Sequence, residues 1–366
     1  MRAVVLAAAI ALVFSLLGTP WVIRYLTRKQ FGQFIRHDGP ASHHTKRGTP
    51  TMGGVVIIVA TLIGWAGGNL LTSHTPNVSS VLVVFLMVGL GLVGFLDDGI
   101  KISKERSLGL RAGWKILLQG LVGVGFSLLV LQFPDDQGVY PASTAISFLR
   151  DTALDFAVWG PAIGIIGFVI WSNFLITAWS NAVNLTDGLD GLATGAALIF
   201  FGAYVLVAIW QTNQLCGVNN SDAATCYEVR DPRDLAILAA AIAGACLGFL
   251  WWNASPAKIF MGDTGSLALG GAIAGITIVT RTEILGGIIG GLFVIIVLSS
   301  VLQIGFFKIS GGKRIFKMAP LHHHFELMGW GEVTIVTRFW IIAALFTGAG
   351  MGLFYAEWVA NLGPGG

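Results

Sequence analysis

Residues 80–96 read SVLVVFLMVGLGLVGFL, an unbroken apolar stretch that ends on the acid pair Asp97 and Asp98. About 20 apolar residues in helical form cross the hydrocarbon core of a bilayer. Nine other stretches have a similar character. The ten predicted spans run approximately over residues 3–23, 51–72, 80–96, 112–133, 157–179, 189–210, 234–253, 265–280, 284–307 and 336–358. The sequence therefore predicts an all-α integral membrane protein of about ten transmembrane helices, built as a single domain over residues 1–366. Because the eighth stretch is short and rich in glycine, nine spans remain an alternative.

The composition also favours lipid as the solvent. Hydrophobic residues make up 55% of the chain and charged residues only 11%, whereas soluble domains carry about 25% charged residues. The first stretch is similar to a signal peptide, but it runs into Pro20 and Arg24 without a small-residue cleavage site. We therefore expect it to stay as a transmembrane helix.

The basic residues are concentrated on one side of the predicted spans. The loops after the first, third, seventh and ninth spans, with the adjoining helix starts, carry 17 of the 22 Lys and Arg residues. Basic residues are enriched in cytoplasmic loops of membrane proteins. The sequence thus predicts that these loops are cytosolic and that both termini are external.

Three cysteines are present. Cys216 and Cys226 lie in the predicted external loop after the sixth span, where a disulfide and two free thiols are both compatible with the sequence. Cys246 is predicted to pack inside the seventh span. No Cys or His spacing typical of zinc sites occurs, so a structural metal site is not expected.

The acid pair is the first of five polar clusters in the predicted cytosolic loops. Adjacent carboxylates at a helix end repel each other unless a cation offsets them, and Mg²⁺ typically binds one or two carboxylates together with phosphate oxygens. The alternative is a solvated acid pair neutralised by Lys101 and Lys104.

The second cluster is NAVNLTDGLDG, residues 181–191, between the fifth and sixth spans. It places Asn184, Asp187 and Asp190 beside flexible glycines in one short loop. A turn with a capping Asp is the alternative, but it does not account for so many polar groups between apolar helices.

The third cluster is KIFMGDTGS, residues 258–266, which opens the eighth span. A helix N-terminus favours phosphate, and the glycines allow close approach of a ligand. For Asp263, a role at the site and a plain N-cap are equally supported by this motif alone.

The fourth cluster is MAPLHHHFE, residues 318–326. Its histidines, His322, His323 and His324, suit a metal patch, a phosphate clamp or an acid–base group. Consecutive side chains do not all face one ion on a regular helix or strand, so contact of one or two histidines with phosphate is favoured.

The fifth cluster is SHHTKRGTPTMGG, residues 42–54, where basic residues followed by Gly and Pro suit an anion-binding loop that includes Lys46. Lys115 lies about one turn inside the fourth span. It either extends to the membrane interface or pairs with a phosphate or carboxylate.

Taken together, carboxylates, histidines and lysines on one side of the membrane indicate a divalent metal, a phosphorylated substrate and a lipid partner. An ion-coupled transporter is a rival, but its acids should lie near the bilayer midplane in broken helices. A scaffolding role leaves the acids unexplained, and no nucleic-acid partner is expected.

The segments HHTKRGTPTMGG, FLDDGIK, NAVNLTDGLDGL, KIFMGDTGSL and MAPLHHHFEL, in this order, resemble the phospho-N-acetylmuramoyl-pentapeptide transferase family. This family lies within the polyprenyl-phosphate N-acetylhexosamine-1-phosphate transferase superfamily, and the resemblance covers nearly the whole chain. It implies a multi-pass protein of the bacterial inner (plasma) membrane with its active site facing the cytoplasm. It also implies Mg²⁺-dependent transfer of phospho-MurNAc-pentapeptide from UDP-MurNAc-pentapeptide to undecaprenyl or a related polyprenyl phosphate, giving lipid I and UMP for peptidoglycan synthesis.

The resemblance also implies residue roles. It makes Asp263 the Mg²⁺ ligand and places Asp97 and Asp98 beside the metal and the lipid phosphate, one of them proposed as base or nucleophile. It places Asn184, Asp187 and Asp190 on the nucleotide side, with Phe260 stacked on uracil. It places Lys46 and Lys115 at the nucleotide and phosphates, and His322, His323 and His324 near the diphosphate and sugar. Lys115 and His324 are counted, with the three acids, among the catalytic residues.

One position departs from the family pattern. Members often carry a glutamate in the ninth span, three residues before a serine, where this chain has Ile296 before Ser299. Any role of that glutamate is absent here or supplied elsewhere.

The nearest rival function is that of a sister transferase that moves GlcNAc-1-phosphate. The histidine triplet argues against this alternative. The sequence leaves a homodimer open.

Overall fold

The computed structural model describes residues 1–29, 48–104, 108–220, 222 and 224–362. Within these residues, ten helices are long and apolar enough to cross a membrane. They are α1 (Arg2–Arg28), α2 (Gly54–Leu71), α3 (Val78–Ser103), α4 (Ala112–Leu129), α5 (Pro161–Thr186), α6 (Leu192–Asn213), α7 (Pro232–Asn253), α8 (Gly262–Val279), α10 (Gly291–Ile309) and α12 (Glu332–Asn361). The predicted ten-span, all-α membrane architecture is confirmed, and α8 corresponds to the doubtful eighth stretch.

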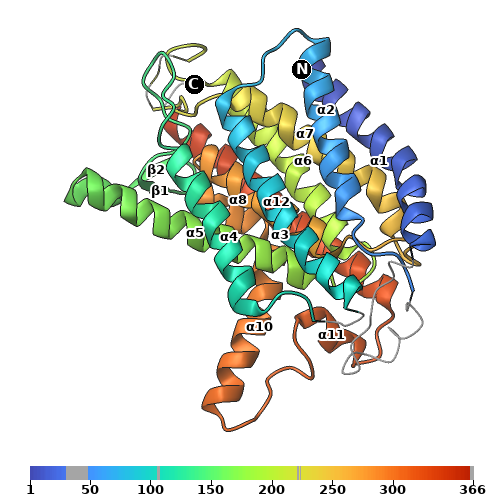
Figure 1. The fold of residues 1–366 in the computed structure, drawn as a ribbon. Coiled ribbons are helices and arrows are strands. Elements are labelled where there is room, and N and C mark those ends of the chain that lie inside the picture. The colour runs from blue at the N-terminus through green and yellow to red at the C-terminus, as the bar shows by residue number, and fades with distance from the viewer. Residues whose placement is uncertain (30–47, 105–107, 221, 223, 363–366) are drawn as a thin grey trace.

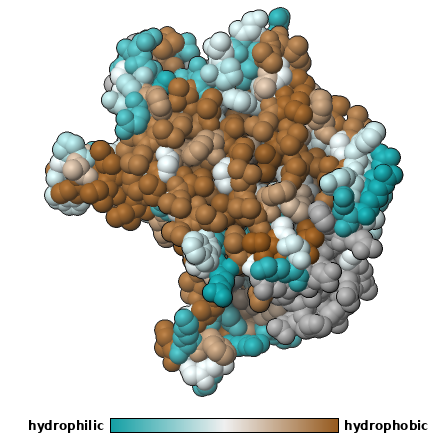
Figure 2. Space-filling view, in the orientation of Figure 1, coloured by the Kyte–Doolittle hydropathy of each residue, from teal (hydrophilic) through white to brown (hydrophobic). Residues whose placement is uncertain are grey.

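The surface agrees with this architecture. Figure 2 shows a broad apolar surface across the middle of the visible face, with hydrophilic residues gathered toward its two ends. Many large apolar side chains on the outer helices are exposed, as expected for helices that face lipid. The two ends of the chain lie at the same end of the bundle, whereas α11 (Leu321–Glu326) and the free end of α10 lie at the other (Figure 1).

The central helix is α8, whose residues 264–279 are all buried. It packs mainly against α3 and α5. Small residues allow this packing, because a side chain at Gly270 would collide with the backbone of Ser180 on α5, and one at Gly94 would collide with the backbone of Asp263. Small residues thus permit close helix packing here, and the same close approach brings the ends of α3 and α8 together.

The ninth span differs from the prediction of one helix over 284–307. The structure has a short helix, α9 (Glu283–Ile289), and then α10, with a break at Gly290. A Cβ at Gly290 would lie 2.5 Å from the Trp179 ring. The break therefore lies where an aromatic side chain of α5 packs directly on the backbone, and α10 continues away from the bundle (Figure 1).

The predicted external loops are more structured than simple polar connectors. Strands β1 (Ala145–Ser147) and β2 (Asp151–Asp155) form an antiparallel hairpin, and the short 3-10 helix η2 (Phe156–Trp159) follows. Cys216 and Cys226 form a disulfide, which decides between the two alternatives that the sequence left open. Cys246 is buried, as predicted.

Candidate active site

Three carboxylates converge where α3 ends and α8 begins. Asp97 and Asp98 lie near the end of α3 and Asp263 in the first turn of α8, and one oxygen from each lies within 4.8 Å of the others. Asp97 and Asp98 are 2% and 3% exposed. The interpretation of a solvated acid pair is therefore wrong, because the pair is buried against α8.

Two lysines compensate this negative charge. The Lys101 Nζ lies 2.7 Å from Asp97 Oδ2, 3.5 Å from Asp98 Oδ1 and 3.1 Å from Asp263 Oδ2. Lys115, in the first turn of α4, donates to Asp263 Oδ2. Of the two alternatives for Lys115, the structure therefore shows pairing with a carboxylate. The sequence indicated Lys101 only as a residue that could neutralise the acid pair. Its spacing of three and four residues from Asp98 and Asp97 nevertheless places these three side chains on the same side of α3.

Asp98 caps α8 from another helix. Its carboxylate accepts hydrogen bonds from the Thr264 backbone N–H at 2.9 Å, the Thr264 hydroxyl at 2.8 Å and the Asp263 backbone N–H at 3.2 Å. The plain N-cap interpretation of Asp263 is therefore wrong. The N-terminus of α8 attracts an anion, as its dipole predicts, but the anion is the side chain of Asp98.

Asn184, near the end of α5, fixes the other side of Asp263. Its Nδ2 donates to Asp263 Oδ1 at 2.8 Å and to Ser266 Oγ at 2.9 Å. Asp187 follows directly at the end of α5. Burial, reinforced by the charges of Asp263 and Asp98, raises the pKa of Asp187 well above its ordinary value. The second and third clusters therefore meet the acid pair in one site.

Asp190 and Phe260 organise the loops beside this site. Asp190 Oδ2 accepts a hydrogen bond from Ala257 N–H at 3.0 Å, which joins the loop after α5 to the loop before α8. Phe260 N–H donates to the Pro50 carbonyl at 2.8 Å. The Asp190 N–H donates to Glu332 Oε1 at 2.8 Å, a contact that the sequence did not indicate.

The three histidines lie in the short helix α11 and have different surroundings. His322 is buried, and a side chain at Gly188 would collide with its ring. His323 Nδ1 lies 2.6 Å from Glu326 Oε2, and His324 Nδ1 accepts the Lys317 N–H at 3.1 Å. The three histidine side chains therefore have different neighbours.

The ninth span holds α11 in place. Ser299 Oγ accepts the Leu321 N–H at 3.0 Å and donates to the Ile296 carbonyl at 2.6 Å. Ile296 itself is fully buried in the apolar core. At this position the chain therefore has a packing residue. Lys46 lies outside the described residues, so its predicted role stays a prediction.

The donor set suits a hard divalent cation. Three carboxylates meet at one point, and oxygen ligands of this kind are those that Mg²⁺ and Ca²⁺ prefer. The neighbouring lysines suit phosphate oxygens. The arrangement can therefore hold a metal and a diphosphate side by side.

Comparison with known proteins agrees with this chemistry. A model of glycosyl transferase family 4 matches residues 80–281, which include the three acids, and phospho-N-acetylmuramoyl-pentapeptide-transferase signature 1 matches residues 46–58. A phospho-N-acetylmuramoyl-pentapeptide-transferase of Beutenbergia cavernae is 66% identical over 99% of this chain and 100% of its own length. Proteins with the same name from Kineococcus radiotolerans and Paenarthrobacter aurescens are 63% and 60% identical over 99% of this chain and their full length.

Proposed function

The chain belongs to glycosyl transferase family 4 and, within it, to the phospho-N-acetylmuramoyl-pentapeptide transferases, and on this premise we propose how its site makes lipid I. The reaction moves phospho-MurNAc-pentapeptide from UDP-MurNAc-pentapeptide to a polyprenyl phosphate and releases UMP. The observation that carries the proposal is the convergence of Asp97, Asp98 and Asp263 with Lys101 and Lys115 at one end of the helix bundle.

In the proposed site Asp263 is the principal Mg²⁺ ligand and Asp97 lies beside the metal. Asp98 is the weaker candidate for a direct ligand, because its oxygens already accept three hydrogen bonds from the start of α8. Bound Mg²⁺ supplies charge neutralisation of the donor diphosphate. Asn184 orients Asp263 through its 2.8 Å hydrogen bond.

We favour direct attack by the lipid phosphate over a covalent aspartyl intermediate. An oxygen of the acceptor phosphate attacks the β-phosphorus of the donor, and the bond from that phosphorus to the UMP oxygen breaks. The acceptor is already anionic near neutral pH, so little general-base help is needed, and phosphoryl transfer depends mostly on positioning and charge. The hydrogen bonds to Asp98 and the Lys101 contact of Asp97 lower the nucleophilicity of both carboxylates.

The lysines and the neighbouring loops hold the donor. Lys115 and Lys46 contact its phosphates, which stabilises the charge that develops on UMP. Asn184, Asp187 and Asp190 lie on the nucleotide side, with Phe260 placed to stack on uracil. His322, His323 and His324 approach the diphosphate and sugar, with His324 in the catalytic group.

The site faces the cytoplasm of the plasma membrane in this proposal. The basic residues support that orientation, since most of them lie in the loops at the end where α3 finishes and α8 begins. The acids lie at helix ends on one side of the bundle rather than at mid-membrane. This position argues against the ion-coupled transporter.

The test is UMP release from UDP-MurNAc-pentapeptide by the purified protein with polyprenyl phosphate and Mg²⁺. We expect EDTA to stop the reaction and Mg²⁺ to restore it. Turnover of UDP-GlcNAc in place of the muramoyl donor would instead support the sister transferase. A phospho-sugar adduct on the protein, trapped without lipid acceptor, would contradict direct attack.

A further inference from the structure

The first turn of α12 contacts the loop that joins α5 to α6. Glu332 is the first residue of α12, and its Oε1 accepts the Asp190 N–H at 2.8 Å. The two residues are 142 positions apart in the chain. Asp190 is 4% exposed, and Glu332 is half-buried. Because a carboxylate accepts a backbone N–H more strongly than a neutral group does, this contact is a firm link between the C-terminal helix and the α5–α6 loop.

Asp190 continues this link to a second loop. Its Oδ2 accepts the Ala257 N–H at 3.0 Å. Ala257 lies three residues before Phe260, in the loop that leads into α8. Two hydrogen bonds in series, one at the backbone of Asp190 and one at its carboxylate, therefore join the start of α12 to the loop that carries Phe260. We call this set of contacts, from Glu332 through Asp190 to Ala257, the loop clamp.

Packing of α12 on α6 gives the clamp a fixed base. The Trp340 Nε1–H donates to the Leu192 carbonyl at 3.3 Å. A Cβ built at Gly195 on α6 would collide with the Trp340 ring, so the ring packs directly on the backbone of α6. Both contacts come from the first three turns of α12. Glu332 is therefore presented to the α5–α6 loop by an anchored helix.

The histidine helix holds the same loop at another point. A Cβ built at Gly188 would collide with the His322 ring, so α11 packs on the loop two residues before Asp190. This second anchor does not depend on Glu332. Loss of the Glu332 contact should therefore loosen the part of the loop around Asp190 without removing α11 from its place.

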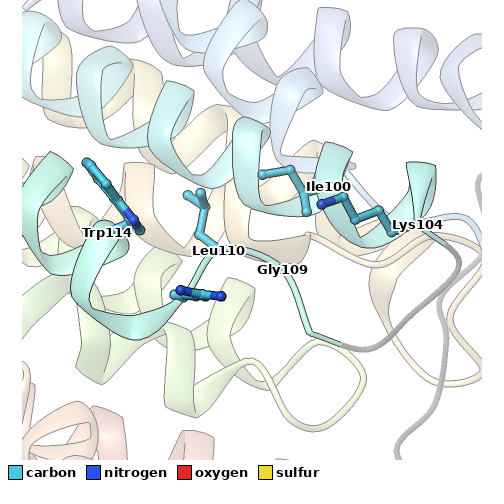
Figure 3. A pocket seen from close by; sticks show the side chains of 6 residues that line it. Ile100, Lys104, Gly109, Leu110 and Trp114 are labelled. Carbon is cyan, nitrogen blue, oxygen red and sulfur yellow. The ribbon is translucent and has the colours of Figure 1, made fainter.

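The clamp is separate from the pocket that opens beside the acid pair. This pocket has a volume of about 320 Å³ and lies between the end of α3 and the start of α4. Figure 3 shows Ile100 and Lys104 on α3 and Trp114 on α4 around it. All six described residues that line the pocket come from the chain between Ile100 and Trp114. A change at Glu332 should therefore leave this side of the site as it is.

We propose that Glu332 is a positioning residue for the nucleotide half of the donor. Through Asp190 it fixes the α5–α6 loop against the loop that carries Phe260. The inference rests on the proposed function, in which Asp190 and Phe260 lie on the nucleotide side. Glu332 acts through Asp190 and does not touch the reacting atoms. Its effect is on binding, because loops that are already ordered bind a ligand without the entropy cost of ordering them.

Three variants separate the hydrogen bond from the charge. Glu332→Ala removes the acceptor, Glu332→Gln keeps an acceptor oxygen at the same reach, and Glu332→Asp keeps the charge on a shorter side chain. We expect the KM for UDP-MurNAc-pentapeptide to rise about tenfold in the alanine and aspartate variants, because a hydrogen bond to a charged group contributes that much or more to an equilibrium constant. It should rise only about threefold in the glutamine variant, because a neutral hydrogen bond is roughly half as strong. The kcat and the KM for polyprenyl phosphate should stay near wild type.

Binding of UMP, measured by calorimetry, gives a readout that does not need turnover. The dissociation constant of UMP should rise by the same factor as the donor KM in each variant, because UMP occupies only the nucleotide half of the site. Val333→Ala is the matched control. Val333 is the next residue of α12 and is 62% exposed, so its loss should change neither value.

An unchanged donor KM in Glu332→Ala would overturn the inference. So would a donor KM in Glu332→Gln as high as in Glu332→Ala, because the charge and not the hydrogen bond would then be responsible. A lower kcat with an unchanged donor KM would also overturn it, because Glu332 would then act on the chemical step. If the alanine variant does not fold, the comparison of glutamine with aspartate, at matched thermal unfolding midpoints, decides in its place. A wild type that releases no UMP would instead contradict the proposed function.

Discussion

Replacement of Gly109 by alanine tests whether the placement of Asp97 controls the reaction. Gly109 has no side chain, and a Cβ built on its backbone would lie 2.5 Å from Asp97 Oδ1 and 2.6 Å from Asp97 Cγ and Oδ2. Close carbon–oxygen contacts in proteins are about 3.3 Å or longer. The Asp97 carboxylate must therefore retreat by roughly 0.8 Å, since the end of a side chain moves more easily than the packed backbone around it.

The retreat breaks the contacts that define the site. Asp97 would leave Lys101, now at 2.7 Å, and the Leu110 N–H, now at 2.8 Å. A misplacement of about 1 Å at a catalytic group costs on the order of 100-fold in rate. We expect kcat for UMP release to fall on the order of 100-fold in Gly109→Ala, with a normal yield of folded protein.

Gly99→Ala is the control, because nothing lies within 4 Å of a Cβ built at Gly99. It adds the same methyl group close by on α3, where alanine is a better helix former than glycine. This variant should keep wild-type turnover and should not lose thermal stability. Equal activity of the two variants would show that the position of Asp97 does not limit the reaction and would refute the reasoning.

Three further predictions concern single groups. Asp263→Asn should abolish UMP release while leaving membrane insertion intact, and wild-type turnover would contradict its assignment as the metal ligand. Replacement of both Cys216 and Cys226 by serine should lower the free energy of unfolding by about 3 kcal/mol, because the disulfide closes a loop of 10 residues in the unfolded chain. Turnover should persist. An unchanged thermal unfolding midpoint would argue against this prediction. Burial raises the pKa of Glu283 to about 7 from 4.5, although Ser147 donates to its carboxylate. The folded state therefore binds this proton more tightly than the unfolded state. The free energy of unfolding should fall by up to about 3 kcal/mol as the pH rises from 4.5 to 7. Glu283→Gln should flatten this dependence, and a variant with the same pH slope as wild type would exclude Glu283 as its source.

The transmembrane helices could be predicted because the signal for a span is local. Twenty apolar residues such as those around residues 80–96 have one stable solution in a bilayer. The break at Gly290 could not be predicted, because the Trp179 ring that packs against this position belongs to another helix. A glycine inside an apolar run is equally compatible with a continuous helix. Local patterns therefore identify the spans but not the places where another element interrupts them.

The gathering of the site was predictable for a topological reason. Loops that follow odd-numbered spans lie on one side of the membrane, so the acid pair, Asn184 and Asp263 could be assigned to one region before any contact was known. The contacts themselves depend on residues far apart in the chain. Asp98 and Thr264 are separated by 166 positions, and Asn184 and Asp263 by 79. No pattern within either segment specifies such a partner.

The acid pair shows most clearly what the three-dimensional arrangement adds. Asp97 and Asp98 are neighbours of the same type, and from the sequence their roles are interchangeable. Both carboxylates approach Lys101, but adjacent residues of a helix point about 100° apart, and the other partners of the two acids differ. Asp98 accepts three hydrogen bonds from the start of α8, whereas Asp97 accepts one from the Leu110 N–H and makes the shorter contact with Lys101. The two acids of the motif therefore differ in their hydrogen-bond partners, a difference that the sequence alone does not show.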